Sequence, residues 1–440
     1  MENSSSSSNL VEQTYTIGTS TDSAALSDQV KRYRSRRLKE PASNELKKDV
    51  AGDLSKEPLT LKCIKVIVAN FAKSPAHSGV PAKHMREIAQ QLPIDLDAGI
   101  AAVYVHDENY WKRRCMQSLA ASECQIIEHG LTWKQLYFEH HLRKRLESFE
   151  ADEDGAKLEP LLDEIRKYQD NVFTLSFKQL PSHIDIDRVV EALPNLTKLD
   201  VQYSINKIGM NFDRRLFGMK ITDASCLAKS VKDSLNLTSV ILAGNLMDDD
   251  LLRMLMTGLY KSSTITHLDV SHNKITNHGV RLLAKLLGTK SVLTSLNIAD
   301  NQVHAEGGRY LGRALRSNDS LTDLNMRLNR LTDEGGRMLL EGLKENQSVT
   351  RLNLSSNCLG TESTQALSVV LRGDESQLMV LDLSSNQLGD GDVETLGATM
   401  GRNQKIISLD LRMNSTSVES EAMDKIEAML HKNELALRQD

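Results

Sequence analysis

Seven asparagines in the C-terminal half recur at a nearly constant spacing, and this period limits the fold more than any other feature of the sequence. They are Asn245, Asn273, Asn301, Asn329, Asn357, Asn386 and Asn414, at intervals of 28, 28, 28, 28, 29 and 28 residues. In every unit, apolar residues stand 8, 5 and 3 positions before the asparagine, as in LTSLNIADN at 293–301. Such a period predicts stacked units that bury their apolar faces against their neighbours, rather than one globular core.

The unit has the form L-x-x-L-x-L-x-x-N, which is that of the leucine-rich repeat. Its L-x-L core predicts a short strand that turns its leucines inward and its intervening side chains to a concave surface. The asparagine side chain can bond backbone groups where the strand turns away, so a column of asparagines is expected to link successive units. Helical spacing follows, for example at Leu283, Leu286 and Leu287. The predicted fold is α/β: a 28-residue, ribonuclease-inhibitor-like leucine-rich-repeat solenoid, a horseshoe with a parallel inner sheet and outer helices, preceded by a small α-helical domain.

The repeat array is expected to span residues 171–417. One further unit precedes the seven, with Ser204 in the asparagine position, and it is 41 residues from there to Asn245. The 13 extra residues form an apolar insertion near 205–219, which we expect to lie on the edge of the solenoid. Val172, Leu175 and Phe177 fit a degenerate first unit, and residues 418–440 are expected to form a capping helix.

The first half has no repeat. Residues 1–57 are rich in serine and poor in apolar residues, which predicts a disordered arm. Residues 58–150 have helical periodicity and are interpreted as an α-helical domain, with an acidic linker and helix at 151–170. The arm carries a basic cluster, which is either simply solvated or in contact with an acidic partner. That cluster consists of Lys31, Arg32, Arg34, Arg36, Arg37 and Lys39.

Composition narrows the classes of function. Lys+Arg total 54 and Asp+Glu total 59, so the net charge of -5 argues against a nucleic-acid-binding protein. No stretch is apolar for long enough to be a membrane span or a signal peptide, so no membrane partner is expected. Aromatic residues make up 4% of the chain, which favours an aliphatic interior. Five cysteines without a CxxC motif indicate free thiols in a reducing, intracellular compartment.

The side chains that most resemble chemical sites have simpler interpretations. Cys115 and Cys124 are separated by 8 residues, whereas zinc sites usually space paired cysteines by about 2–4. Asp248, Asp249 and Asp250 are expected to complement a helix N-terminus rather than to bind a cation. His140 and His141 are expected on a solvated helix face.

No catalytic motif occurs in the sequence. It has no phosphate-binding GxxxxGK[ST], no GxSxG, no HExxH and no EF-hand. We therefore expect no enzyme activity, no catalytic residue, no cofactor and no metal.

The concave face is the most informative surface. Four positions before the asparagines it carries acidic and amide side chains, and two positions before them it carries two arginines. Much of this pattern belongs to the repeat itself, and the alternative is that the arginines anchor a partner protein. The candidate partner-binding residues are Asp269, Asn297, Asn325, Arg327, Asn353, Asp382, Asp410 and Arg412.

Three blocks outside the repeats narrow the class. DENYWKRRCM at 107–116, WKQLYFEHHL at 133–142 and IGMNFDRRLF at 208–217 resemble, in this order, the T-complex-associated testis-expressed protein family. That family is the leucine-rich-repeat subunit 5 of the nexin–dynein regulatory complex, and the resemblance covers about residues 58–435. The chain departs from it at Arg114, where the family has a second cysteine beside Cys115.

The resemblance implies a structural subunit of the ciliary or flagellar axoneme, within the cytoskeleton of the cytoplasm. Such a subunit helps to link doublet microtubules and to regulate dynein-driven motility. The implied partners are other subunits of that complex, including its second leucine-rich-repeat subunit, and further candidates are tubulin and dynein-arm proteins. The alternative is a cytoplasmic regulator of the GTPase-activating class, which also uses 28-residue repeats. Those proteins place their repeats near the N-terminus and end in an acidic tail, unlike HKNELALRQD here.

Overall fold

The computed structural model describes residues 58–76, 79–126, 132–149, 158–180, 184–204, 217–288, 290–373, 375–415 and 421–438. By its contacts the chain divides into two units, Met1–Ile67 and Val68–Asp440. In the first unit only the beginning of helix α2 (Leu59–Asn70) is described.

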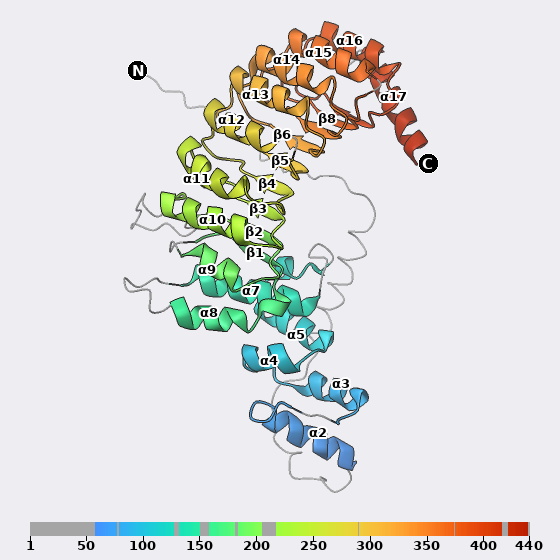
Figure 1. Ribbon diagram of the computed structural model, residues 1–440. Coiled ribbons are helices and arrows are strands. Elements are labelled where there is room, and N and C mark those ends of the chain that lie inside the picture. Colours follow the sequence, from blue (N-terminus) through green and yellow to red (C-terminus); the bar gives the residue numbers. More distant parts are fainter. Residues whose placement is uncertain are drawn as a thin grey trace, which may run out of the picture. The chain divides into compact units, whose positions relative to one another are not determined.

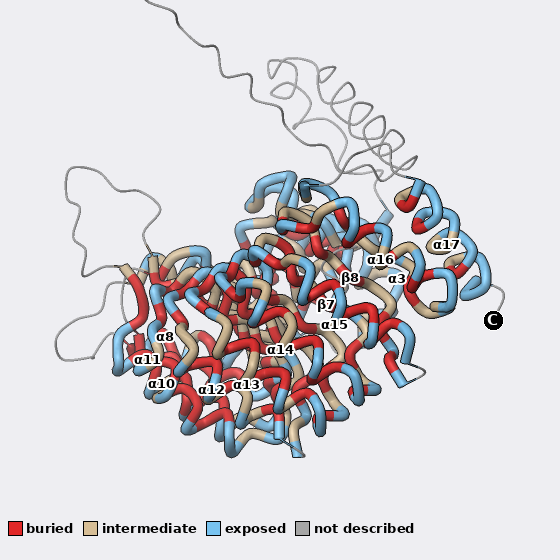
Figure 2. The backbone as a smooth tube through the Cα atoms, turned by 90° about the horizontal axis from the view of Figure 1, so that it is seen from above, coloured by how far each residue is buried: buried red, intermediate tan, exposed pale blue. Residues whose placement is uncertain are grey.

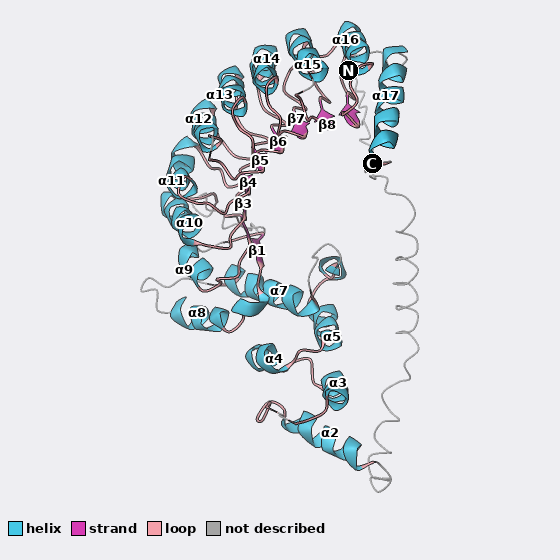
Figure 3. Cartoon of the chain, turned by 45° about the vertical axis from the view of Figure 1, so that its right-hand side comes forward, coloured by secondary structure: helices cyan, strands magenta, loops and turns pink. Residues whose placement is uncertain are grey.

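The second unit contains a sheet of nine parallel strands in chain order, β1 to β9, with a helix after each strand (Figure 1). The strands line the inner side of an arc and helices α9 to α16 lie on its outer side (Figure 3). The strands are β1 Thr174–Phe177, β2 Lys198–Val201, β3 Ser239–Ile241, β4 His267–Asp269, β5 Ser295–Asn297, β6 Asp323–Asn325, β7 Arg351–Asn353, β8 Val380–Asp382 and β9 Ser408–Asp410. The predicted leucine-rich-repeat fold is confirmed.

Some helices precede the sheet in the chain, and others alternate with its strands. In the N-terminal region they are α3 Ala82–Gln91, α4 Ala98–Tyr104, α5 Glu108–Ser118, η1 Ala121–Glu123, α7 Trp133–Glu147, α8 Leu158–Arg166 and η2 Gln169–Asn171. In the repeats they are α9 Ile186–Glu191, α10 Ile221–Asp233, α11 Asp249–Leu259, α12 Asn277–Leu286, α13 Ala305–Leu315, α14 Thr332–Leu343, α15 Thr361–Arg372, α16 Asp390–Met400 and α17 Glu421–Leu437.

Each repeat buries the same positions. The central residue of each strand from β3 to β8 is buried between two half-exposed or exposed neighbours, as the L-x-L pattern predicts. Buried segments alternate with exposed ones through α10 to α15 (Figure 2). The edge strand β9 differs, because its Leu409 is only partly buried. The interior of the repeats is aliphatic, as expected from the composition.

The asparagine column links neighbouring repeats, as predicted. Asn301 is typical: its Nδ2 donates to the carbonyls of Val270, Ile298 and Ala299, and its Oδ1 accepts from the backbone N–H of Ile275. Each asparagine thus satisfies backbone groups of its own turn and of the turn before it. These groups would otherwise be buried without partners, which is costly.

The residue before each of these asparagines turns the chain out of the strand. It takes a left-handed conformation, with φ between 50° and 70° in all seven repeats. Only the first of the seven is a glycine; non-glycine residues are uncommon in this region. The residues are Gly244, His272, Asp300, Leu328, Ser356, Ser385 and Met413.

Helix α7 closes the first edge of the sheet. Oε1 of Glu139 accepts hydrogen bonds from the backbone N–H groups of Phe173 at 3.0 Å and Thr174 at 2.8 Å. Oε1 of Glu147 accepts from the N–H of Lys178 at 2.9 Å. Two carboxylates from one helix therefore replace the missing neighbouring strand, and they block pairing of this edge with another chain.

Helix α17 closes the other end. It buries Ala422 and Ile426, two of the residues predicted for a capping helix. Nδ2 of Asn433 donates to the carbonyls of Asn403 and Ile406, which attaches the helix to the last repeat. Val172, Leu175 and Phe177 of the predicted first unit are likewise fully buried. Residues 205–216 of the predicted insertion near 205–219 lie outside the described part of the chain, and at its end Gly218 and Met219 are buried.

An aromatic cluster forms the core of the N-terminal helical region. Trp111 of α5 contacts Tyr110, Tyr137 and Phe138, with ring centroids 5.0–5.3 Å apart. Arg114 is 6% exposed and lies over the Tyr137 ring at 4.6 Å, while its Nη1 donates to the Tyr110 hydroxyl. The interior of this region is therefore aromatic, unlike that of the repeats.

The prediction that His140 and His141 lie on a solvated face is wrong. Helix α8 and η1 cover that side of α7. The ring of His141 stacks on Tyr137, and its Nε2 lies 3.5 Å from Glu164 of α8. Nδ1 of His140 lies 3.8 Å from Glu123 of η1. Burial lowers the pKa of His141, which favours its neutral form.

The helical region from Val68 onward and the repeats belong to one compact unit, Val68–Asp440. The hydrogen bonds from α7 to β1 cross the expected boundary at 151–170. The separation of 58–150 as a domain of its own stays a prediction. In the described ranges, no helix is long and apolar enough to cross a membrane.

Candidate functional site

The structure brings the candidate concave-face residues into one column. Parallel pairing sets Asp269 opposite Asn297, Asn297 opposite Asn325, and so on through Asn353 and Asp382 to Asp410. All six are partly exposed, because strand alternation turns them away from the core. The two arginines follow their strands by two residues.

Most of this column supports the fold itself. Oδ1 of Asp269 accepts from the backbone N–H and the hydroxyl of Ser271, and Oδ1 of Asp382 does the same for Ser384. These bonds hold the chain as it leaves the strand. Between neighbouring strands, Nδ2 of Asn297 donates to the Asp269 carboxylate at 2.8 Å. The acidic and amide pattern is therefore explained in large part by the repeat.

The two arginines differ in what they offer a partner. Arg412 is 83% exposed, but its guanidinium pairs with Asp410, and this pairing lowers the pKa of the Asp410 carboxyl. Arg327 is exposed and forms no ion pair with any residue that the structure describes. Leu328 beside it is 42% exposed. A free guanidinium next to an exposed leucine makes Arg327 the stronger candidate anchor.

A second column of outward-facing side chains, at the first residue of each strand, was not predicted from the sequence. The first residue of each strand faces the same side as the third, and at this position Arg351 of β7 pairs with Asp323 of β6 at 2.7 Å. The first and third residues of each strand, six and four places before the asparagine, both point outward. The residue six places before each asparagine was therefore the sequence signal for this second column. This ion pair lies next to Asn325 and Asn353 on the concave face.

The acidic triplet has the predicted structural role. The Asp248 carboxylate caps α11 by accepting from the N–H groups of Asp250 and Leu251. Asp249 accepts from the N–H groups of Thr276 and Gly279 at the start of α12 in the next repeat. Two of the three carboxylates are thus used by helix N-termini.

The thiols are all free. The buried Cys115 donates to the carbonyl of Trp133, and burial raises its pKa to about 12. The whole basic arm from Lys31 to Lys39 lies outside the described residues.

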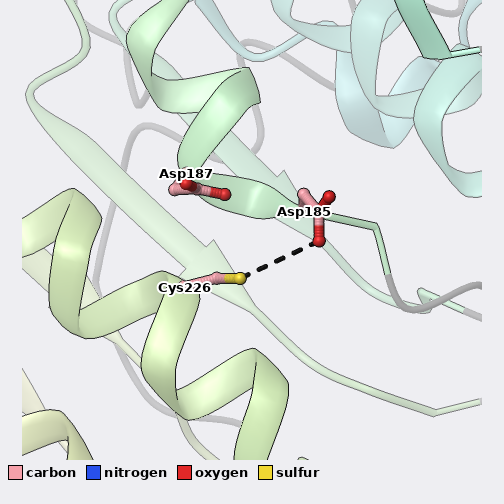
Figure 4. Close-up of side chains that lie close together, drawn as sticks. All are labelled: Asp185, Asp187 and Cys226. Atoms are coloured by element: carbon pink, nitrogen blue, oxygen red, sulfur yellow. Dashed lines mark hydrogen bonds between the residues drawn. The ribbon is translucent and has the colours of Figure 1, made fainter. Parts of the chain in front are cut away.

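One cluster in the described residues has metal-ligating side chains close together (Figure 4). It consists of Asp185, Asp187 and Cys226, whose ligand atoms lie within 4.8 Å of one another. Asp187 already accepts a bond from Lys229 at 2.6 Å, and burial with the nearby carboxylates raises the pKa of Cys226 to about 11. A neutral thiol and a carboxylate already paired with a lysine are weak metal ligands, so we assign no metal to this cluster.

Comparison with known families agrees with the fold. A leucine-rich-repeat family model matches residues 261–284, 289–312, 317–340, 345–368 and 377–397. These segments are leucine-rich repeats, in agreement with the parallel sheet and outer helices of the structure. Among solved structures, an internalin from Listeria monocytogenes is 19% identical, with a TM-score of 0.37 over 60% of this chain and 68% of that chain. A likeness of this size carries no functional conclusion.

The chain is also a homologue of proteins named dynein regulatory complex subunit 5. It is 38% identical to that of Chlamydomonas reinhardtii over 199 residues, which are 45% of this chain and 50% of the relative. It is 31% identical to that of Mus musculus and 33% identical to that of Homo sapiens, each over 247 residues, 50% of this chain and 49% of the relative. The family resemblance of the sequence is confirmed, and the chain spans about half the length of these relatives.

Proposed function

We propose that this chain is a non-catalytic structural subunit of the nexin–dynein regulatory complex in the axoneme of cilia or flagella. The observation that carries the proposal is its 31–38% identity to proteins named dynein regulatory complex subunit 5 in an alga and in mammals. Its role is to help link doublet microtubules and to regulate dynein-driven motility through protein–protein contacts.

The fold suits such a role. A sheet of nine parallel strands closed at both ends offers a long surface of fixed spacing, about 4.8 Å per strand. Its partners in this proposal are the other subunits of the complex, including the second leucine-rich-repeat subunit. Tubulin and dynein-arm proteins are further candidates, and the basic arm is the segment that suits their acidic surfaces.

Within the concave face, the proposal centres on Arg327 and Leu328. Arginine is enriched among interface hot spots, and Leu328 adds exposed apolar surface beside this one. The remaining candidates, from Asp269 to Asp410, then form the polar surroundings of this anchor. Arg412 is the weaker of the two arginines, because Asp410 already neutralises it.

Fractionation of cilia tests the proposal. Cilia are isolated, membrane and matrix are removed with detergent, and the axonemes are washed with increasing salt. We expect the chain to stay with the axoneme and to leave only at high salt. Recovery of the chain in the detergent-soluble fraction, or its absence from cilia, would sink the proposal.

A matched pair of variants tests the face. Arg327→Glu is expected to release the chain at lower salt than the unaltered protein. Arg281→Glu, which makes the same charge change on outer helix α12, is expected to leave the release unchanged. Equal release of both variants would show that the concave arginine is not the anchor.

A further inference from the structure

A second asparagine column runs along the edge where the outer helices end and lead to the next strand. Nδ2 of Asn318 donates to the carbonyl of Leu287 at 3.0 Å, and its Oδ1 accepts from the N–H of Leu321 at 2.8 Å. Asn346 makes the same bonds to Leu315 and Val349. Asn403 repeats them with Leu371 and Ile406. In these repeats the amide closes the edge between adjacent turns.

Asparagine is missing from this position after α10, α11, α12 and α15, where Ser234, Ser262, Lys290 and Glu375 stand. Gly288 supplies no side chain where the neighbouring repeats have Tyr260 and Arg316. A cavity of about 310 Å³ opens there, and its lining includes Tyr260, Ser262, Lys285, Gly288, Lys290 and Val292.

The cavity has an apolar floor, and the serines Ser262 and Ser291 also line it. Leu259, Ile265 and Leu293 are buried beneath it, and Val292 is 40% exposed. The Tyr260 ring forms one side, held in place by a bond from its hydroxyl to the carbonyl of Leu282 at 2.9 Å. The volume is at the small end of the roughly 300–1,000 Å³ of ligand pockets, which suits a side chain rather than a nucleotide or a large cofactor.

The charge at this cavity is of one sign. Its lining contains two lysines, Lys285 and Lys290, and no carboxylate. Both lysines are exposed, and neither forms an ion pair with a residue of the described ranges. An apolar hollow with two free ammonium groups complements an apolar side chain flanked by carboxylates.

We propose that this cavity, which we call the α11–α12 edge pocket, binds an acidic segment of a partner protein. An aliphatic or aromatic side chain of that segment enters the hollow between Tyr260 and Val292. Carboxylates on either side of it meet Lys285 and Lys290. The pocket lies on the helix-to-strand edge and not on the concave face, so this inference goes beyond the proposed function and does not depend on it.

The test uses the purified full chain and a labelled peptide with the sequence Glu-Glu-Leu-Glu-Glu. Fluorescence anisotropy is expected to show saturable binding that weakens with salt. Peptides with alanine at the centre, or with lysine in place of glutamate, are expected to bind at least about tenfold more weakly. A photoreactive leucine in the probe is expected to crosslink to Tyr260 or Val292.

Three variants locate the binding. Lys290→Glu is expected to weaken it by about tenfold, since it places a carboxylate at the rim. Lys344→Glu, an equal charge change on the same edge in a repeat that Asn346 closes, is the matched control and is expected to bind normally. Lys290→Asn restores the second column, so it is expected to fold at least as stably and to lose the peptide.

Absence of saturable binding, or equal affinity of the Lys290→Glu and Lys344→Glu variants, overturns the inference. So does equal affinity for the leucine and alanine peptides. The assay needs no cilia, so a failure of axonemal retention leaves the edge pocket standing. A failure of peptide binding likewise leaves the axonemal role standing.

Discussion

The repeats and the N-terminal helical region are held together in opposite ways. In the repeats the same bonds recur every 28 or 29 residues, and each asparagine closes one turn against the previous one. In the helical region each interaction occurs once: the rings around Trp111, the buried Arg114 and the carboxylate of Glu139. A periodic structure spreads its stability over many equivalent sites, whereas the helical region concentrates it in a few.

Trp111→Ala should have the largest effect, because Trp111 is the centre of the aromatic core. It is fully buried, and its Nε1 donates to the carbonyl of Val105 at 3.0 Å. We expect a loss of about 3–5 kcal/mol in the free energy of unfolding, with early unfolding of the helical region. Hydrogen exchange would show this, and uniform exchange along the whole chain would contradict the separation of the two regions.

Asn329→Ala tests a single repeat. It removes donors to the carbonyls of Ile298 and Met326 and the acceptor of the Val303 N–H. We expect a loss of about 2–3 kcal/mol in urea unfolding, smaller than for Trp111 because the other repeats remain intact. Asn325→Ala on the concave face is the control, and a comparable loss there would mean that the buried column has no special role.

Glu139→Ala tests the junction between the two regions. It leaves the N–H groups of Phe173 and Thr174 without their carboxylate, at an expected cost of about 1–3 kcal/mol. Glu139→Gln keeps one acceptor oxygen and should lose less than half as much. If the alanine and glutamine variants lose the same stability in urea, the charge of Glu139 stabilises the junction and the hydrogen bonds to the edge strand do not.

The smallest expected effect is a pH dependence within the helical region. The hydrogen bond from Arg143, at 2.6 Å, holds the pKa of Glu123 at about 2, below its usual 4.5. The unfolded chain therefore takes up this proton first, so the stabilisation is complete above pH 4.5 and is lost as the pH falls toward 2.

Urea unfolding at about pH 6 and about pH 3 measures this dependence. Glu123→Gln should lower the stability at the higher pH and reduce the difference between the two. Glu434→Gln, which removes an exposed pairing with Arg438 on α17, is the control. An unchanged difference in the Glu123 variant would assign the acid sensitivity elsewhere.

The same contrast explains what could be predicted. The period placed the strands and the buried asparagines correctly, because seven aligned units leave one register for the chain. The second column was missed, since Asn318, Asn346 and Asn403 mark it in three repeats only. Its interruption at Lys290, and hence the edge pocket, has no signal until the column is known.

The helical region gave weaker signals. The spacing of its apolar residues indicated helices, but nothing local told which face of α7 would be covered. His140 and His141 stand in a run of basic residues that suggests a solvated surface, whereas η1 lies against His140 and α8, from later in the chain, lies against His141. Nothing in the sequence indicated the role of Glu139, because its partners follow 34 and 35 residues later. Arg327 was chosen from its position alone, and only the structure separates it from the neutralised Arg412.

The closure of both sheet ends has a consequence for how such a molecule can change over generations. The carboxylates of α7 accept hydrogen bonds from the backbone at β1, and Asn433 of α17 donates to the backbone of the last turn. An internal unit of 28 residues can therefore be duplicated or deleted without disturbing either end. Each such event would lengthen or shorten the inner sheet by about 4.8 Å, so reach can be tuned in discrete steps to the distance between two fixed neighbours.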